Sequence, residues 1–210
     1  MTESEIDVRA LPPRIALATT NRGKLAEATA ILLQRGVAVI AADTLVPGWR
    51  VVEDGANFEE NARIKARDLA ERSGVPALGE DSGLEVAALG GRPGVRSARY
   101  AGDGASDAAK ITRLLEELQD VAGCERAAAF RCAVALAWPD GKIAVAEGRC
   151  EGLIAFAPRG TGGFGYDPIF VDPATGFTFA ELPAEAKNAL SHRRRALDAL
   201  CAALTGGVRL

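Results

Sequence analysis

The chain has 210 residues, 48% of them hydrophobic and 25% charged, with a formal net charge of −3. This composition is typical of a globular protein that buries an adequate core without disulfide or metal support, and the acidic balance argues against nucleic acid as a partner, because phosphate contacts need clustered Lys and Arg. The first nine residues do not resemble a secretory signal and no apolar run approaches the roughly 20 residues of a membrane helix, so we expect a cytoplasmic protein with no membrane partner.

In the first half of the chain, predicted strands alternate with predicted helices. A buried strand over Arg14–Thr19 leads into a helix in which Leu25, Ala28 and Leu32 recur at helical spacing, and Gly36 ends that helix. Such alternation is typical of an α/β fold. The other elements predicted here are a strand over Val37–Ala41, an amphipathic helix over Phe58–Arg72, an extended segment over Ala77–Val86 with a turn near Asp81–Gly83, and a helix over Ala105–Val121.

The second half begins with a predicted antiparallel hairpin. Its strands cover Ala127–Trp138 and Lys142–Cys150, and Pro139–Gly141 between them is a typical turn sequence. A glycine-rich loop over Gly160–Pro168 and a largely helical segment over Glu185–Leu204 follow.

These elements predict a mixed α/β fold, because early strand–helix alternation is followed by an antiparallel pair. The hairpin would build a second lobe, with a cleft between the lobes. We expect residues 14–205 to form a single two-lobed domain, preceded by an N-terminal extension over residues 1–13.

The segment between the first strand and the first helix has the features of a phosphate-binding site. Free backbone N–H groups and the positive end of the helix dipole gather there, Lys24 adds a charge, and Gly23 permits close approach of a ligand. It is not a Walker A loop, since Leu25 stands where that motif requires Ser or Thr. An ordinary capped helix with a solvated lysine is the alternative. The candidate residues are Thr19, Thr20, Asn21, Arg22, Gly23 and Lys24.

Acidic residues at two places in the sequence are candidates for a magnesium site. Glu53 and Asp54 precede the helix predicted from Phe58, and Glu80 and Asp81 stand where the next extended segment is expected to turn. Carboxylates that converge from separate segments would hold Mg²⁺ together with water and substrate phosphates. One of them could also act as general base toward a water nucleophile. A turn with exposed acids is the alternative.

Two further segments carry side chains suited to a nucleotide. Asn61 and Lys65 lie four residues apart on one face of a predicted helix, from which Lys65 could reach a phosphate. An ordinary surface lysine is the alternative. The glycine-rich loop has the spacing G-x-G-x-x-G, but Pro168 disfavours the helix that a dinucleotide-binding fold needs there. We interpret this loop as presenting Phe164 and Tyr166 to a flat base, with core aromatics beside a turn as the alternative.

The basic segment Lys187–Arg195 contains His192, the only histidine in the chain. A lone histidine excludes a multi-histidine metal site, and a solvated basic face is the ordinary interpretation of such a segment. Amine, hydroxyl, imidazole and guanidinium donors nevertheless occur together here. Donors of these kinds would bind the oxo groups of a purine together with a phosphate.

The order of these segments resembles the inosine triphosphate pyrophosphatase family, whose members remove dITP, ITP and XTP. The resemblance runs from Ile15 to about Leu197, nearly the whole chain. The chain departs from the family at Glu80, where an aspartate is frequent, and at Arg96, where an aromatic residue is common. The matching stretches are Thr19-x-Asn21-x-x-Lys24, Phe58–Ala66, Asp81–Leu84, Pro93–Tyr100, Gly162–Pro168 and Ser191–Arg193.

The resemblance implies a Mg²⁺-dependent enzyme that hydrolyses non-standard purine nucleoside triphosphates to the monophosphate and pyrophosphate. It implies an elongated fold with a twisted sheet, flanking helices and a central active-site cleft, usually assembled as a homodimer. By the resemblance, Asp81 is the general base and, with Glu53, a metal-associated acid. The residues that it places on the substrate are Thr19, Thr20, Asn21, Arg22, Gly23, Lys24, Asn61, Lys65, Ser82, Phe164, Gly165, Tyr166, Asp167, Lys187, His192 and Arg193.

Two other functions stay open from the sequence. One is a related enzyme that prefers modified pyrimidine triphosphates. The other is a binding module that senses purine triphosphates without hydrolysing them. The acids that we expect to converge favour an enzyme over a binding module.

Overall fold

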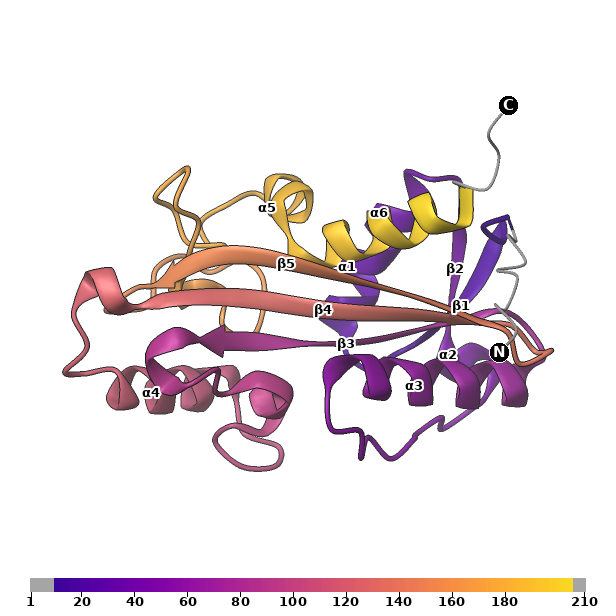
Figure 1. Ribbon diagram of the computed structural model, residues 1–210, viewed down its shortest axis with the longest axis horizontal. Helices are drawn as coiled ribbons and strands as arrows, with labels where there is room; N and C mark the ends of the chain where they lie inside the picture. The colour runs from indigo at the N-terminus through magenta and orange to yellow at the C-terminus, as the bar shows by residue number, and fades with distance from the viewer. Residues whose placement is uncertain (1–9, 206–210) are drawn as a thin grey trace, which may run out of the picture.

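The computed structural model describes residues 10–205, which form an elongated molecule built on one six-stranded sheet (Figure 1). Its strands are β1 (Arg14–Ala18), β2 (Ala38–Ala41), β3 (Ala77–Val86), β4 (Ala127–Ala137), β5 (Ile143–Ile154) and β6 (Phe170–Val171). The strand order is β2-β1-β3-β4-β5-β6. β1 runs parallel to both β2 and β3, and the remaining pairs are antiparallel. The mixed sheet confirms the predicted fold class, and the β4–β5 hairpin confirms the predicted turn.

Helices cover both faces of this sheet. They are α1 (Arg22–Leu33), α2 (Ala42–Leu45), α3 (Phe58–Ser73), α4 (Asp107–Glu117), α5 (Ala184–Leu190) and α6 (His192–Thr205), with short 3₁₀ segments η1 (Ala87–Leu89), η2 (Gly94–Arg99), η3 (Gly123–Glu125) and η4 (Asp167–Ile169). Figure 1 shows α6 along one side of the long strands and α3 along the other. Among residues 10–205, no helix combines the length and the apolarity needed to cross a bilayer.

Two apolar layers enclose one end of the sheet because successive residues of its strands point to opposite faces. On one face Ile15 and Leu17 pack with α1 and α6, and on the other face Ala16 and Ala18 pack with α3. Gly79 brings α3 close to β3, since a Cβ there would lie 2.1 Å from the carbonyl oxygen of a residue in α3. A separate aromatic and aliphatic core, with Phe130, Phe170 and Phe179 in contact, fills the other end of the sheet. Each end of the sheet, together with the core that covers it, forms one of the two lobes.

β3 is continuous at the point where the sequence predicted a turn, so that prediction is wrong. Asp81 pairs with Ala133 of β4 and Gly83 pairs with Arg131, within a ladder that runs the full length of β3. The small residue at position 83 serves close packing, because a Cβ there would lie 2.4 Å from the carbonyl oxygen of Gly94. Uninterrupted pairing with β4 overrides the turn preference of an Asp-Ser-Gly sequence.

The C-terminal helical segment is broken at Ser191, which the sequence did not predict. Ser191 has extended dihedral angles (φ −69°, ψ 153°), and its hydroxyl accepts the N–H of Arg194 at 3.1 Å. It therefore caps α6 and separates it from α5. The helix predicted over residues 105–121 is shorter than expected, as α4 ends at Glu117.

Most of the predicted N-terminal extension, residues 1–9, lies outside the described residues. Of the remainder, Leu11 packs against the core beside α1 and α6. The carbonyl oxygen of Pro13 accepts the N–H of Ala38 at 2.9 Å and so continues the pairing of β1 with β2.

Candidate active site

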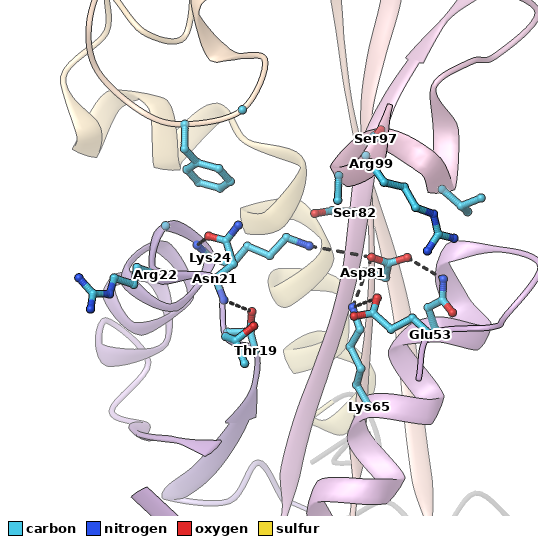
Figure 2. Close-up of a pocket in the computed structure, with 18 of the residues that line it drawn as sticks. Thr19, Asn21, Arg22, Lys24, Glu53, Lys65, Asp81, Ser82, Ser97 and Arg99 are labelled. Carbon is cyan, nitrogen blue, oxygen red and sulfur yellow. Dashed lines mark hydrogen bonds and ion pairs between the residues drawn. The ribbon is translucent and has the colours of Figure 1, made fainter. Parts of the chain in front are cut away.

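The sheet topology leaves one edge of β3 uncovered beside the start of α1. β1 pairs with β3 only as far as Ala18 and Gly79, and the chain then turns from β1 into α1. The next residues of β3, Glu80 to Gly83, pair with β4 on one side and with no strand of the described chain on the other. A cleft of about 870 Å³ opens here between the two lobes (Figure 2).

All the residues that the resemblance assigns to the site line this one cleft. The segments involved are separated by up to about 170 residues of chain, and the fold brings them together. Asp54, a further candidate acid, is exposed and does not line the cleft. The predicted lining residues are Thr19, Thr20, Asn21, Arg22, Gly23, Lys24, Glu53, Asn61, Lys65, Asp81, Ser82, Phe164, Gly165, Tyr166, Asp167, Lys187, His192 and Arg193.

Asp81 is held in place by polar groups from α3 and α1. Asn61 donates its amide N–H to Asp81 at 3.0 Å and accepts the N–H of Gly55 at 2.9 Å. The ammonium group of Lys65 lies 3.4 Å from the Asp81 carboxylate, and that of Lys24 lies 4.0 Å from it. Asn61 and Lys65 are both buried, which confirms that they share one face of α3. The carboxylate is thereby fixed at the cleft wall before any ligand binds.

Glu53 and Asp81 converge on a single point. The ammonium group of Lys65 lies 2.5 Å from the Glu53 carboxylate and 3.4 Å from that of Asp81, so both acids face the same cation. The described residues contain no cluster of three or more metal-ligating side chains. Mg²⁺ is typically bound by one or two carboxylates, with water and substrate phosphates completing the shell, so these two acids fit a Mg²⁺ site.

The start of α1 has the geometry of a phosphate-binding site. Asn21 caps the helix by accepting the N–H of Lys24 at 3.1 Å, and the hydroxyl of Thr19 accepts the N–H of Asn21 at 3.1 Å. Gly23 has a packing role that the sequence did not reveal, because a Cβ there would lie 2.5 Å from the ring of Phe164. The glycine-rich loop thus packs directly on the first turn of α1.

That loop gives its two aromatic residues different roles. Phe164 is half-buried at the cleft, and the ammonium group of Lys187 lies 4.8 Å from the centre of its ring. Tyr166 is buried, and its hydroxyl donates to the carbonyl oxygen of Ser97 at 3.0 Å. Tyr166 therefore follows the alternative interpretation of a core aromatic, although it still borders the cleft. Asp167 accepts the N–H of Phe164 at 2.8 Å and contacts Lys187.

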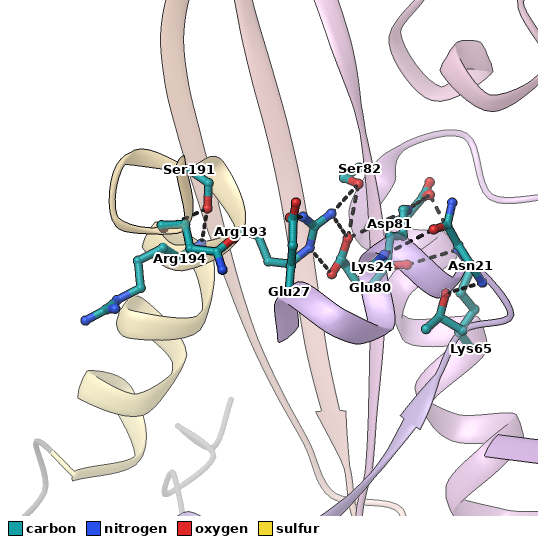
Figure 3. A network of polar contacts seen from close by, with 12 residues as sticks. Asn21, Lys24, Glu27, Lys65, Glu80, Asp81, Ser82, Ser191, Arg193 and Arg194 are labelled. Atoms are coloured by element: carbon teal, nitrogen blue, oxygen red, sulfur yellow. Dashed lines mark hydrogen bonds and ion pairs between the residues drawn. The ribbon is translucent and has the colours of Figure 1, made fainter. Parts of the chain in front are cut away.

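A buried ion-pair network, which was not predicted from the sequence, lies behind the cleft wall (Figure 3). The Arg193 guanidinium donates to both carboxylate oxygens of Glu80, at 2.7 Å each, and also contacts Glu27. Glu27 in turn accepts from Lys187 at 2.6 Å. Arg193 is only 1% exposed, so the interpretation of its segment as a solvated face is wrong at this residue. The one available signal was that Glu27 lies one helical turn after Lys24.

Burial and charge set the protonation of this network. Burial raises the pKa of Glu80, but the charges of Arg193 and Lys24 outweigh it and hold that pKa well below its usual range. Burial and the Arg193 charge hold the pKa of His192 well below its usual range, so its imidazole is neutral at pH 7. The His192 ring stacks on Phe130 with centroids 4.8 Å apart. Its Nδ1 is buried and has no hydrogen-bond partner within residues 10–205.

Basic side chains outnumber acidic ones along the cleft, although the chain as a whole is acidic. Low-dielectric walls lined by one sign of charge concentrate ligands of the opposite sign. The basic residues are Arg22, Lys24, Arg50, Lys65, Arg99, Lys110, Lys187 and Arg193. The acidic residues are Glu53, Asp81, Asp103, Asp107 and Asp167.

A helix N-terminus, several cations and a fixed carboxylate at the open edge of a mixed sheet define an α/β protein whose cleft suits a polyphosphate. The chain belongs to the Ham1 family, whose sequence profile matches residues 15–203.

Relatives and solved structures of this family are similar to the chain over most of its length. A dITP/XTP pyrophosphatase of Geobacter sulfurreducens is 52% identical over 89% of this chain and 94% of its own length. A dITP/XTP pyrophosphatase of Geobacillus kaustophilus is 50% identical over 89% and 91% of the two chains. The structure of a HAM1 protein from Coxiella burnetii matches with a TM-score of 0.81 at 44% identity, covering 92% of this chain and 98% of its own.

Proposed function

We propose that this cleft binds dITP, ITP or XTP and hydrolyses it to the nucleoside monophosphate and pyrophosphate. The observation that carries the proposal is the Asp81 carboxylate, fixed by Asn61 and Lys65 beside the N-terminus of α1. The relatives that match most of the chain are named for this activity. Residues 14–205 would act as one two-lobed domain, with the cleft between the lobes as its active site.

We further propose that the enzyme requires a divalent cation and that this cation is Mg²⁺. Glu53 and Asp81 would hold it, because both face the point now occupied by the Lys65 ammonium group. When bound, Mg²⁺ would neutralise phosphate charge and favour the deprotonated form of a nearby water. Lys65 would then turn toward the substrate phosphates, a movement that its long side chain allows.

In the proposed mechanism, Asp81 is the general base. It would take a proton from a water molecule as the water oxygen forms a bond to the α-phosphorus of the substrate. The bond between the α-phosphorus and the oxygen bridging to the β-phosphorus would break, and pyrophosphate would leave with that electron pair. Lys24 and Lys65, both beside Asp81, would neutralise negative charge on the reacting phosphates as pyrophosphate leaves, and Asp81 would later release its proton to solvent.

The other end of the cleft would select the base. Phe164 would stack on the purine and Lys187 would donate a hydrogen bond to an oxo group, while Arg193, held by Glu80 and Glu27 behind the cleft wall, would keep this end of the cleft positive. Asp167, His192 and the backbone of Gly165 and Tyr166 would complete this pocket. Adenine carries an amino group in place of the 6-oxo group and would leave these donors unpaired, which costs binding energy.

A substrate panel tests this function. With Mg²⁺, we expect pyrophosphate release from dITP and XTP to exceed release from dGTP and from methylated pyrimidine triphosphates, and EDTA should abolish it. A preference for the methylated pyrimidines would instead identify an enzyme of the pyrimidine-directed class. Binding without pyrophosphate release under any metal condition would identify a sensor and contradict the proposal.

Lys24→Ala should raise KM for dITP by about 10-fold, because one charge-assisted hydrogen bond to phosphate is worth roughly 1.5–3 kcal/mol. Steady-state kinetics at saturating Mg²⁺ would measure the change. Lys142→Ala, at the far end of the β4–β5 hairpin and outside the cleft lining, is a control that should leave KM unaltered. An unchanged KM and kcat in Lys24→Ala would remove this lysine from the phosphate site.

We also propose that the protein works as a homodimer in the cytoplasm, where nucleotide pools are found. Sedimentation of the purified chain would test the assembly. A single species with the mass of one 21.9 kDa chain across micromolar concentrations would contradict it.

A further inference from the structure

Three arginine side chains along the cleft lack an acidic partner within residues 10–205. Arg50 donates to the carbonyl oxygen of Trp49 at 2.6 Å. Arg22 and Arg99 make no side-chain hydrogen bond or ion pair with any described residue. In Figure 2, Arg22 extends away from Asp81, whereas Arg99 extends into the same region of the cleft as Asp81. Within the described part of the chain, Arg99 is thus an unpaired guanidinium on the same side of the cleft as the fixed carboxylate.

The backbone that carries Arg99 is tightly held. The hydroxyl of Ser97 accepts the N–H of Leu84 in β3 at 2.9 Å and donates to the carbonyl oxygen of Gly94 at 2.6 Å. The carbonyl oxygen of Ser97 accepts the hydroxyl of Tyr166 at 3.0 Å. These bonds fix η2 to the strand that bears Asp81. Arg99 therefore starts from a rigid position, while its own side chain remains exposed.

The order of side chains along the cleft indicates which part of a bound nucleotide would lie near Arg99. Phe164 packs on Gly23 at the start of α1, and the next residue, Lys24, reaches to within 4.0 Å of Asp81. In the view of Figure 2, Arg99 lies on the side of Asp81 opposite Lys24. A nucleotide with its base near Phe164 and its α-phosphate near Asp81 would carry its outer phosphates toward Arg99.

We propose that Arg99 binds the β- and γ-phosphates of the substrate and neutralises the leaving pyrophosphate. This inference rests on the proposed function, because that reaction releases the outer two phosphates. A guanidinium presents two parallel N–H groups that match phosphate oxygens, and Arg99 has no acidic partner among residues 10–205, which leaves these donors available. Arg99 would then contribute to selectivity for triphosphates over monophosphates. The base pocket does not contribute to that selectivity, because both kinds of nucleotide carry the same base.

The test compares Arg99→Ala with Arg96→Ala. Arg96 lies on the same 3₁₀ segment and is also exposed, but it does not line the cleft. For Arg99→Ala we expect KM for dITP and the inhibition constant of inorganic pyrophosphate to rise about 10-fold each, with inhibition by dIMP changed less than about twofold. Arg99→Lys should retain part of the affinity, because it keeps the charge and loses the paired donors. Arg96→Ala should match the wild type.

Calorimetry with inorganic pyrophosphate gives a measurement that does not depend on turnover. We expect the wild type to bind pyrophosphate with Mg²⁺ about 10-fold more tightly than Arg99→Ala does. Unchanged pyrophosphate affinity in a folded Arg99→Ala, or an equal loss of dIMP affinity, would overturn the inference. If Arg99→Ala does not fold, Arg99→Gln and Arg99→Lys give the same comparison.

Failure of the proposed function would look different. In that case the wild type would release no pyrophosphate from any purine triphosphate. Active wild type together with an Arg99→Ala variant of unaltered kinetics would instead reject only the role of Arg99.

Discussion

Asp81→Asn should lower kcat for dITP hydrolysis roughly 10³-fold, because a positioned general base contributes about 10²–10⁴-fold. The amide that replaces the carboxylate is nearly isosteric and still accepts from Asn61, so the fold and the triphosphate site should survive. Pyrophosphate release would measure kcat, and calorimetry with a non-hydrolysable triphosphate would measure binding.

The controls for this experiment separate chemistry from charge. Asp120→Asn also removes one negative charge, at an exposed residue after α4 that does not line the cleft, and should leave kcat unaltered. An Asp81→Asn variant that keeps near wild-type turnover would show that another group acts as the base. A variant that loses triphosphate binding as completely as turnover would assign Asp81 to binding in place of proton transfer.

Glu80→Ala should lower the free energy of unfolding by about 3 kcal/mol, because removing one partner of a buried ion pair typically costs 3–5 kcal/mol. We expect the lower end of that range, since Glu27 remains in contact with Arg193 after the change. Urea unfolding of purified protein would measure the loss. In the double variant Glu80→Leu with Arg193→Met much of the stability should return, because no buried charge is then left unpaired.

An exposed ion pair provides the matched control. Glu59 and Arg63 lie one turn apart on α3 at 2.7 Å, with side chains 41% and 33% exposed. Such pairs contribute about 0.3–0.5 kcal/mol, so Glu59→Ala should change stability little. A loss in Glu80→Ala no larger than that in Glu59→Ala would contradict the structural role of the Glu80–Arg193 pair.

The Glu80–Arg193 pair also predicts how the free energy of unfolding depends on pH. The pKa of Glu80 is lower in the folded chain than its ordinary value of 4.5, so its contribution is fully present above that pH and is lost as pH falls below it. The difference in unfolding free energy between wild type and Glu80→Gln should therefore shrink progressively below about pH 4.5. A difference that stays constant from pH 6 to pH 3 would contradict the lowered pKa.

Local chemistry was enough to predict the start of α1 from sequence. Asn21 is a strong capping residue after a buried strand, and that cap depends only on residues three apart. The hairpin of β4 and β5 follows in the same way from the turn at Pro139–Gly141. The apolar face of α3 could also be predicted from the sequence, because Ala62, Ala66 and Leu69 repeat at helical spacing. All three are buried in the structure.

The candidate site was predicted residue by residue, but mainly through the order of its six motifs. Taken singly, Lys65 and Arg193 had an ordinary surface interpretation, since most lysines and arginines are solvated. Both are buried, and each is paired with carboxylates that are distant in the sequence. Spacing along one helix shows which residues share a face, and it does not show what lies opposite that face.

The turn predicted at Asp81–Gly83 failed for the same reason. The intrinsic preference of Asp-Ser-Gly for a turn is worth little against a ladder of hydrogen bonds to β4, and that partner lies about 50 residues further along the chain. The break at Ser191 likewise places Arg193 on the first turn of α6, from which it reaches Glu80.

By itself, the sequence determined where α1 and α3 begin, which face of α3 is apolar, and which polar residues were candidates for a phosphate, a metal and a base. The tertiary structure alone decided that β1 stops pairing with β3 at Gly79, so that the side chain of Asp81 borders the cleft at an open edge of the sheet, and that Glu27 and Glu80 neutralise Arg193 behind it. The physical reason is distance along the chain. Caps and helical faces depend on neighbours within a few residues, whereas strand pairing and buried charge depend on partners that only the folded chain brings within a few ångströms.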